Sequence, residues 1–282
     1  MKFIDLHIHS TASDGSLTPT EVVKEAEKLG LAAIALTDHD TVDGIDEALG
    51  AASDLNLTVV PGIELSCIYQ EKEIHMLGLY IDHKNEELLQ FINEAARKRR
   101  ERNETMLAAF QKDHFQISME DLTMGNPKTT ITRAHFARAL LKKGYVSSVD
   151  QAFKKYLGPG CPYYRKRESI TPEEAIQAIQ NAGGFAVLAH PCQYKLGWER
   201  TEELISCLKA RGLGGLECFH SSNNQEESGK LRKLAVKYRL VPTGGSDFHG
   251  AAKPDIKIGS GRGGLRVPAL YLDEIRLSMF LL

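Results

Sequence analysis

Short apolar segments alternate with capped helical segments through most of this 282-residue sequence, and the alternation constrains the fold more than any other feature. Thr18, Pro19 and Glu21 form a capping box that opens one helix, and Thr171-Pro172-Glu173-Glu174 opens another. The β-rich segments are 3–9, 31–36, 57–60, 74–81, 185–189, 215–219 and 240–243. Alternating β and α units imply a parallel sheet, and about seven strands favour a barrel over an open sheet.

The middle of the chain departs from this pattern. From about residue 85 to 168 the signals are almost wholly helical, with a charge run at 97–104 and helices expected at 131–143 and 148–157. We therefore expect an α/β barrel built from residues 1–84 and 169–282, with a helical insertion at 85–168. The closing segment 256–282 is ambiguous, and its glycine-rich run at 259–264 is expected to be a plain loop, because no Lys-Ser/Thr follows it.

Composition excludes several classes of protein. The net charge of −2 provides no overall field that would recruit long nucleic acid or an anionic membrane. Five cysteines, an odd number without CxxC spacing, argue against a disulfide framework and against a zinc-thiolate site. The opening residues MKFIDLHIHS lack a signal-peptide pattern, and no apolar run is long enough to span a bilayer. We expect a protein of the reducing cytoplasm.

Potential metal ligands gather at the ends of the expected strands. Six of the ten histidines and three carboxylates stand at or near such ends: His7, His9, Asp14, His39, Glu64, His75, His190, Asp247 and His249. In parallel α/β barrels the carboxyl ends of the strands form one face, where loops from different strands meet in the active site. This shared position predicts one common site.

Each of these residues alone has an ordinary interpretation. His39 suits a surface loop, Asp14 suits a turn, and His75 at the start of a strand could be a hydrogen-bonded core histidine. His7 and His9, however, leave one strand face about 7 Å apart at Cβ and can close on one cation. Three carboxylates brought together would also repel one another unless cations neutralised them. Taken together, the set predicts a metal site whose mixed ligands suit manganese, iron or zinc alike.

In order along the chain the motifs are His-Ile-His-Ser (7–10), Ser-Asp-Gly (13–15), Thr-Asp-His-Asp (37–40), Gly-Ile-Glu (62–64), Leu-Ala-His-Pro (188–191) and Gly-Ser-Asp-Phe-His-Gly (245–250). This series resembles the PHP (polymerase and histidinol phosphatase) family. The resemblance implies a distorted (β/α)7 barrel with two to three divalent metal ions. It assigns His7, His9, Glu64 and Asp247 to one metal, Glu64, His75 and His190 to a second, and Asp14, His39 and His249 to a third.

The insertion narrows the resemblance. Residues 131–138, together with 152–158, are similar to the subgroup of nucleoside 3′,5′-bisphosphate phosphatases, whose bacterial members also act as 5′→3′ exonucleases on short RNA. The resemblance implies that Arg133 and His135 contact the substrate, with Arg165 from a segment that closes over the site. The chain has Thr-Arg-Ala-His where the subgroup usually has Gly-Arg-Pro-His. Two apart on a helix, Arg133 and His135 would not share a face unless the helix begins there.

The ligand set predicts metal-dependent hydrolysis of phosphate esters. A metal-bound hydroxide held by the cluster would attack phosphorus, with Asp14 and His249 among the catalytic residues. Asp5, on the same strand face as His7, is expected to orient an imidazole. The expected substrate is a small nucleotide or a short RNA end rather than a long duplex, which needs extended phosphate contacts. Alternatives are a histidinol-phosphate phosphatase and a non-catalytic PHP-like module; the sequence does not indicate an oligomeric state.

Overall fold

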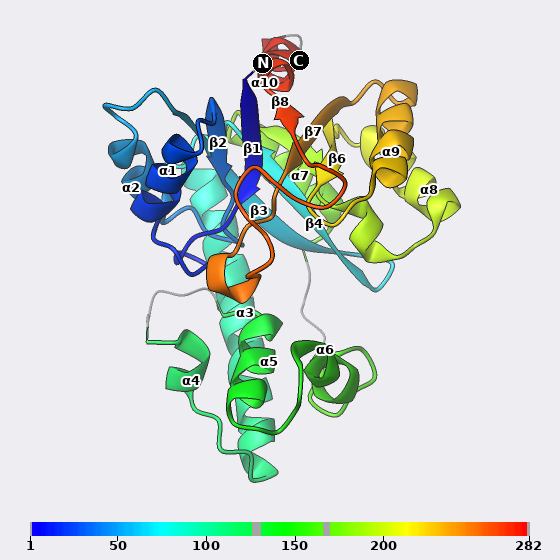
Figure 1. Ribbon diagram of the computed structural model, residues 1–282. Helices are drawn as coiled ribbons and strands as arrows, with labels where there is room; N and C mark the ends of the chain where they lie inside the picture. The colour runs from blue at the N-terminus through cyan, green and yellow to red at the C-terminus, as the bar shows by residue number, and fades with distance from the viewer. Residues whose placement is uncertain (1, 126–130, 166–169, 281–282) are drawn as a thin grey trace. The chain divides into compact units, whose positions relative to one another are not determined.

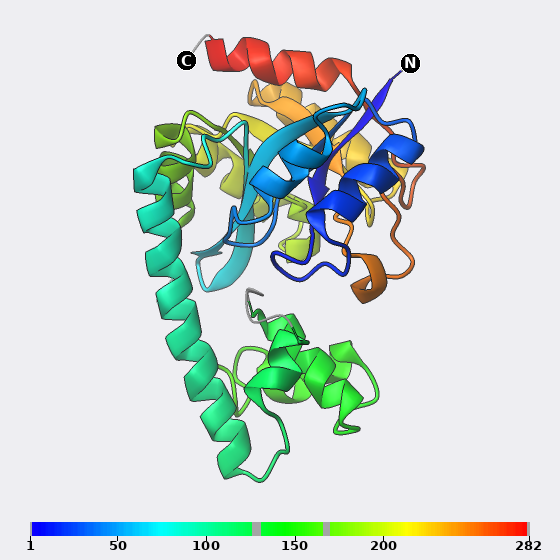
Figure 2. The same ribbon diagram turned by 90° about the vertical axis from the view of Figure 1, so that its left-hand side faces the viewer.

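The structure, a computed structural model, describes residues 2–125, 131–165 and 170–280. It divides into two compact units, one made of residues 1–91 and 170–282 and the other of residues 92–169. The long helix α3 (Glu86–Lys112) begins in the first unit and continues into the second (Figure 2). The first unit holds the barrel and the predicted metal ligands, and each unit is described by itself below.

One eight-stranded sheet forms the first unit (Figure 1). Its order is β7-β6-β5-β4-β3-β2-β1-β8. The strands are β1 (Phe3–Ile8), β2 (Ala33–Leu36), β3 (Thr58–Tyr69), β4 (Lys72–Leu79), β5 (Phe185–Leu188), β6 (Gly215–His220), β7 (Val241–Gly245) and β8 (Val267–Pro268). The curved, nearly closed sheet with intervening helices confirms the predicted class of distorted α/β barrel.

The expectation of a wholly parallel sheet is wrong at two strands. β4 runs antiparallel to both β3 and β5, and β8 runs antiparallel to β1. Only Gln70 and Glu71 separate β4 from β3, and both adopt positive φ angles, of 45° and 66°. A two-residue turn of this kind joins strands as a hairpin and leaves no room for a crossover helix. β3 also continues well past Val60, where the sequence suggested that it would end.

Loops at the carboxyl ends of β1 and β7 bring the two sides of the sheet together. The backbone N–H of Asp247 donates to the carbonyl oxygen of His7 at 2.9 Å, and that of His9 donates to Phe248 at 3.0 Å. Asp5 adds a further bond between β1 and the loop after β7, because its Oδ1 accepts the backbone N–H of Ser246 at 2.9 Å. These bonds link the first and last long strands of the sheet and set two ligand-bearing segments side by side.

Helices pack against the sheet and contribute side chains to its hydrophobic cores. α1 (Pro19–Lys28) and α2 (Ile45–Ala51) contribute to a core with Ile8, Ile34 and Leu36. α10 (Leu270–Phe280) contributes Leu272 and Ile275 to a second core with strand residues. Figures 1 and 2 show α10 across the end of the sheet where β1 begins, away from the ends that carry the metal ligands. The other helices of this unit are α7 (Pro172–Asn181), α8 (Trp198–Lys209) and α9 (Gln225–Lys237).

The second unit is helical and has its own core. Besides the later part of α3 it contains α4 (Met119–Thr123), α5 (Arg133–Lys142), α6 (Val149–Ala152) and a π-helical turn at Phe153–Leu157. Phe110 stacks on Tyr163 with ring centroids 3.8 Å apart, and Phe136 packs against the same cluster. The helices expected at 131–143 and 148–157 are confirmed. Among the described helices of both units, none is long and apolar enough to cross a membrane.

Candidate metal centre

The nine predicted ligands converge in one cluster, most of them at or beyond the carboxyl ends of strands, with Glu64 inside β3 and His75 inside β4. A tenth residue, His220, joins them. Nearly all of the ten side chains are buried. Their ligand atoms form four groups within which every atom lies within 4.8 Å of the others. The groups are His9, Asp14, His39 and His249; His7, His220 and Asp247; His7, Glu64 and His190; and His39, Glu64 and His75. Shared members show that these are overlapping parts of one cluster.

Glu64 lies at the centre of the cluster and is fully buried. Its Oε2 atom is 3.1–3.2 Å from imidazole nitrogens of His7, His9 and His39, and its Oε1 atom is 2.8–2.9 Å from those of His75 and His190. Both oxygens of one carboxylate therefore face separate sets of imidazoles. A carboxylate placed in this way can bridge two cations.

The loop after β2 places His39 beside Glu64. The sequence suggested that Glu64 follows the end of a strand, but it lies inside β3, opposite Leu77 of β4. The residues around His39 form a short bridge to it: Asp40 N donates to the Glu64 carbonyl at 2.9 Å, and Glu64 N donates to that of Asp38 at 3.2 Å. The backbone of Glu64 is thus held between β4 on one side and the loop after β2 on the other.

Two ligands adopt backbone conformations that non-glycine residues rarely take. His190 has φ of 25° and Asp247 has φ of 55°, each just beyond a strand end. Such conformations cost on the order of 1 kcal/mol and need support from neighbouring groups. Support comes from the hydrogen bond of Asp247 N to His7 O and from that of His190 N to Glu217 Oε2 at 2.6 Å. Positive φ angles at ligand positions are typical of functional sites, although other residues such as Gln70 and Glu71 adopt them too.

Buried polar atoms in the cluster fit cations. His7 Nε2, both ring nitrogens of His9 and Glu64 Oε2 are buried without a hydrogen bond to any described residue. Such groups are rare in folded proteins unless an ion or water satisfies them. Imidazole nitrogens and carboxylate oxygens are the ligands of zinc, manganese and iron sites. The donor set therefore fits divalent metal ions.

The pKa shifts in the cluster are also consistent with a site for divalent cations. Burial alone would raise the pKa of Glu64, but the imidazoles of His39 and His7 hold it well below its usual value. Burial lowers the pKa of His9, whereas Asp247 and Glu64 outweigh it and raise that pKa to about 9. A proton on an imidazole such as His9 thus balances the charge of the ionised carboxylates when no cation is bound. Metal binding must displace such protons, so that affinity rises with pH.

Glu217 contacts two of the predicted ligands, His7 and His190, and was not predicted from the sequence. It is fully buried in β6, and its Oε1 accepts from His7 Nδ1 at 2.9 Å. This bond turns Nε2 of His7 towards Glu64 and Asp247. Asp5, which was expected to orient an imidazole, instead accepts the backbone N–H groups of His7, Ser246 and Gly259. The only sequence signal for Glu217 was a carboxylate within the apolar run Gly-Leu-Glu-Cys-Phe.

His220 could have been found by the rule that found the others. It ends β6, whereas the expected strand stopped one residue earlier, at Phe219. Its Nε2 lies 3.3 Å from Oδ2 of Asp247, and its Nδ1 is 2.8 Å from the hydroxyl oxygen of Ser222. A histidine at the carboxyl end of a barrel strand satisfies the positional criterion already applied to the other ligands.

The three predicted substrate contacts lie in the helical unit. Arg133 is the first residue of α5, as the sequence required if it and His135 were both to lie at a helix start, and its guanidinium stands 5.5 Å from the ring centre of Tyr164. His135 is buried, and its Nδ1 accepts the backbone N–H of Thr132 at 3.0 Å, so the neutral ring carries its proton on Nε2. Arg165 Nη1 donates to the carbonyl oxygens of Pro162 and Tyr164, each at 3.0 Å.

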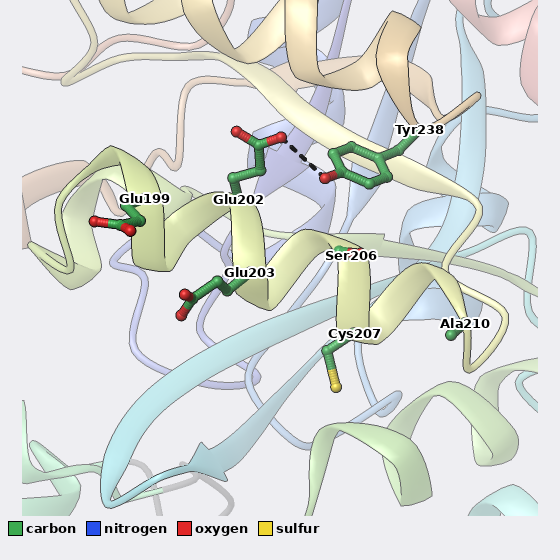
Figure 3. Close-up of a pocket in the computed structure, with 7 residues that line it drawn as sticks. All are labelled: Glu199, Glu202, Glu203, Ser206, Cys207, Ala210 and Tyr238. Carbon is green, nitrogen blue, oxygen red and sulfur yellow. Dashed lines mark hydrogen bonds between the residues drawn. The ribbon is translucent and has the colours of Figure 1, made fainter.

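A surface pocket of about 660 Å³ lies along α8 and shares no residue with the metal cluster (Figure 3). Its lining residues are Glu199, Glu202, Glu203, Ser206, Cys207, Ala210 and Tyr238. Tyr238 donates its hydroxyl hydrogen to Glu202 at 2.9 Å. Lys237 pairs with Glu202, but Glu199 and Glu203 contribute further negative charge that disfavours anions, so this pocket does not suit a phosphate ester.

Comparison with known proteins agrees with this site. The chain is 36% identical over 248 residues to a 5′-3′ exoribonuclease of Haemophilus influenzae, covering 88% of this chain and 90% of that protein. It is equally similar to a 3′,5′-nucleoside bisphosphate phosphatase of Chromobacterium violaceum, 36% identical over 251 residues with 88% of each chain covered. The solved structure of an amidohydrolase from C. violaceum, with bound sulfate and no metal, superposes with a TM-score of 0.86 at 34% identity over 98% of this chain and 96% of that one. Residues 5–210 match the PHP domain, and the chain belongs to the PHP domain family.

Proposed function

We propose that this chain, a metal-dependent phosphoesterase of the PHP family, hydrolyses phosphate monoesters of nucleotides such as nucleoside 3′,5′-bisphosphates, and acts also on short 5′-phosphorylated RNA. The observation that carries the proposal is the buried Glu64 carboxylate with imidazoles on both oxygens. Relatives similar over nearly 90% of their length are a nucleoside bisphosphate phosphatase and an exoribonuclease, which supports a nucleotide substrate.

We further propose that two to three divalent ions, manganese, iron or zinc, occupy the cluster. Ligands for one would be His7, His9, Glu64 and Asp247; for a second, Glu64, His75 and His190; and for a third, Asp14, His39 and His249. When bound, such ions supply positive charge to phosphate oxygens and lower the pKa of a water molecule towards neutrality. Which side-chain atoms could bind these ions or exchange protons depends on the hydrogen bonds of the cluster.

Hydrogen bonds fix which imidazole nitrogens are available. Nδ1 of His249 lies 2.9 Å from the carbonyl oxygen of Asp247, which can only accept, so Nδ1 carries a proton and Nε2 is the nitrogen that could face a cation or, when protonated, donate to a carboxylate. That Nε2 lies 3.1 Å from Oδ1 of Asp14. Burial would raise the pKa of Asp14, but His249 and His39 hold it well below its usual value, so the carboxylate stays ionised. This pair could hold a cation or accept a proton at the edge of the cluster.

Substrate recognition is proposed for Arg133, His135 and Arg165. A guanidinium can bind phosphate bidentately, and an imidazole N–H can donate a hydrogen bond to a phosphate or ribose oxygen. Arg133 stands over Tyr164, whose ring limits the positions that the guanidinium can take. The five cysteines are all free thiols, which suits the reducing cytoplasm that we propose as the location.

The first test is a phosphate-release panel on the purified protein supplied with manganese. We expect kcat/KM for adenosine 3′,5′-bisphosphate to exceed that for histidinol phosphate by at least about 10-fold, a difference of roughly 1.4 kcal/mol in transition-state binding. The opposite order would make a histidinol-phosphate phosphatase the better assignment. Protein that binds manganese but releases phosphate from no substrate, including 5′-phosphorylated oligonucleotides, would indicate a non-catalytic module.

The second test separates substrate binding from metal binding. Arg133→Ala should raise KM for the bisphosphate about 10- to 100-fold, because a charge-assisted contact to phosphate is lost. Its manganese content, measured by plasma mass spectrometry, should equal that of the wild type. Arg100→Ala, at an exposed position of α3, serves as the matched control and should behave as wild type. An unchanged KM in Arg133→Ala would remove Arg133 from the substrate site.

A further inference from the structure

Lys253 approaches the metal centre from a short turn that directly follows the last ligand motif. The turn is a 3-10 helix at Gly250–Ala252, which begins immediately after His249. It is fixed to the Asp14 loop, because Ser16 N donates to His249 O at 3.1 Å and Ala251 N donates to Ser16 Oγ at 2.8 Å. Lys253 N closes the turn on Gly250 O at 3.0 Å. The backbone therefore holds Lys253 in a defined place beside the cluster.

The two oxygens of Asp247 face different neighbours. Oδ1 faces the cluster, 3.3 Å from His9 Nε2 and 3.6 Å from His7 Nε2. Oδ2 lies 2.6 Å from the ammonium nitrogen of Lys253 and 3.3 Å from Nε2 of the buried His220. Asp247 can therefore offer Oδ1 to a cation while Oδ2 keeps its contact with Lys253. Lys253 need not leave when the cluster is loaded.

We propose that Lys253 binds a phosphoryl oxygen of the substrate beside the metal centre, with the N–H groups that its contact with Asp247 does not use. This inference rests on the proposed phosphoesterase function. A lysine ammonium has three N–H donors, and one bond to Asp247 leaves two. Its side chain is 40% exposed, so Lys253 is accessible to a ligand that enters from solvent.

Charge and position favour phosphate as the partner. The side chains of the cluster are imidazoles and carboxylates. Among the described lysines and arginines of the first unit, only Lys253 forms an ion pair with one of these side chains. It therefore places a fixed positive charge beside the cluster, where a phosphate would bind. Lys253 belongs to the same unit as the metal ligands, so its distance from them is set by the barrel itself. A charged donor directly beside a metal ligand is the arrangement that holds a phosphate oxygen against a cation.

The test measures binding of inorganic phosphate to the manganese-loaded protein by titration calorimetry. Lys253→Met should weaken binding by about 10- to 100-fold, because it removes a charged donor and keeps the length of the side chain. Lys253→Arg should restore most of the affinity. Lys257→Met changes an exposed lysine four residues along the same loop and should leave binding unchanged. Manganese content should be equal in the wild type and the three variants. Lys253→Met should also raise KM for the nucleotide substrate and change kcat less.

Two results would overturn the proposal. Phosphate affinity equal to wild type in Lys253→Met would show that the ammonium does not contact the anion. Loss of manganese from Lys253→Met, with recovery in Lys253→Arg, would show that Lys253 only positions Asp247 as a ligand. A wild-type protein that binds phosphate through Lys253 but hydrolyses no nucleotide would instead contradict the proposed function and leave the role of Lys253 intact.

Discussion

Replacing Glu64 with glutamine should reduce turnover by at least about 1000-fold and should lower the bound manganese by at least one ion per chain. The substitution keeps the shape of the side chain but removes the charge whose two oxygens face five imidazoles. An amide also presents an N–H₂ group on one side, where a cation would need a lone pair. Phosphate release and plasma mass spectrometry on the same preparations provide the two measurements.

A matched control is Glu25→Gln, at a partly exposed position of α1 where the carboxylate lies 3.7 Å from the ammonium nitrogen of the exposed Lys28. It should keep full activity and metal content, since exposed pairs of this kind contribute little. Circular dichroism would establish that Glu64→Gln retains its fold. A folded Glu64→Gln protein with full manganese content and normal turnover would show that catalysis uses ions bound elsewhere.

The position of the metal centre could be predicted from the sequence because of one geometric regularity. In a β/α barrel the carboxyl ends of parallel strands meet on one face, so residues far apart in the sequence, such as His9 and His190, could be assigned to one site. Capping boxes at Thr18 and Thr171 are present in the structure as the sequence indicated. Local hydrogen-bonding rules and strand periodicity were sufficient for this much of the fold.

The direction of β4 could not be predicted in the same way. Hairpins with two-residue turns are usually predicted from an Asn-Gly or Asp-Gly pair in the sequence, whereas this turn is Gln70-Glu71. The turn is held by the long β3–β4 pairing rather than by its own residues, and that pairing is a tertiary feature. Glu64 was consequently expected past a strand end although it lies inside β3.

Partners of the ligands were harder to predict than the ligands themselves. Glu217 lies in mid-strand, and its role depends on His7, which is 210 residues earlier in the chain. Asp5 and Glu217 are both buried carboxylates near His7, yet one binds backbone N–H groups and the other binds the imidazole. Residue type and spacing do not distinguish these two roles, because the distinction depends on how β1 and β6 lie across the barrel.

Gly245→Ala should destabilise the barrel by about 3 kcal/mol and disrupt the metal centre with it. A Cβ atom at this position would lie 2.4 Å from both N and Cβ of His7 and 2.7 Å from Oδ1 of Asp5. His7 N and Cβ cannot rotate out of the way, so β7 would have to move away from β1. The hydrogen bonds of Ser246 N to Asp5 and of Asp247 N to His7 would then weaken.

The chain provides an opposite control in Gly229, which lies within α9 with no atom inside 4 Å of an added Cβ. Gly229→Ala should stabilise the protein by about 0.5–1 kcal/mol, because alanine loses less conformational entropy in a helix than glycine. Urea unfolding midpoints of both variants in chelator, followed by manganese content at equilibrium, measure the two effects separately. A Gly245→Ala protein as stable as the wild type and fully loaded with manganese would show that β1 and β7 need not meet for the ligands to assemble. Loss of both properties in Gly245→Ala alone would make the contact between these strands the structural basis of the metal centre.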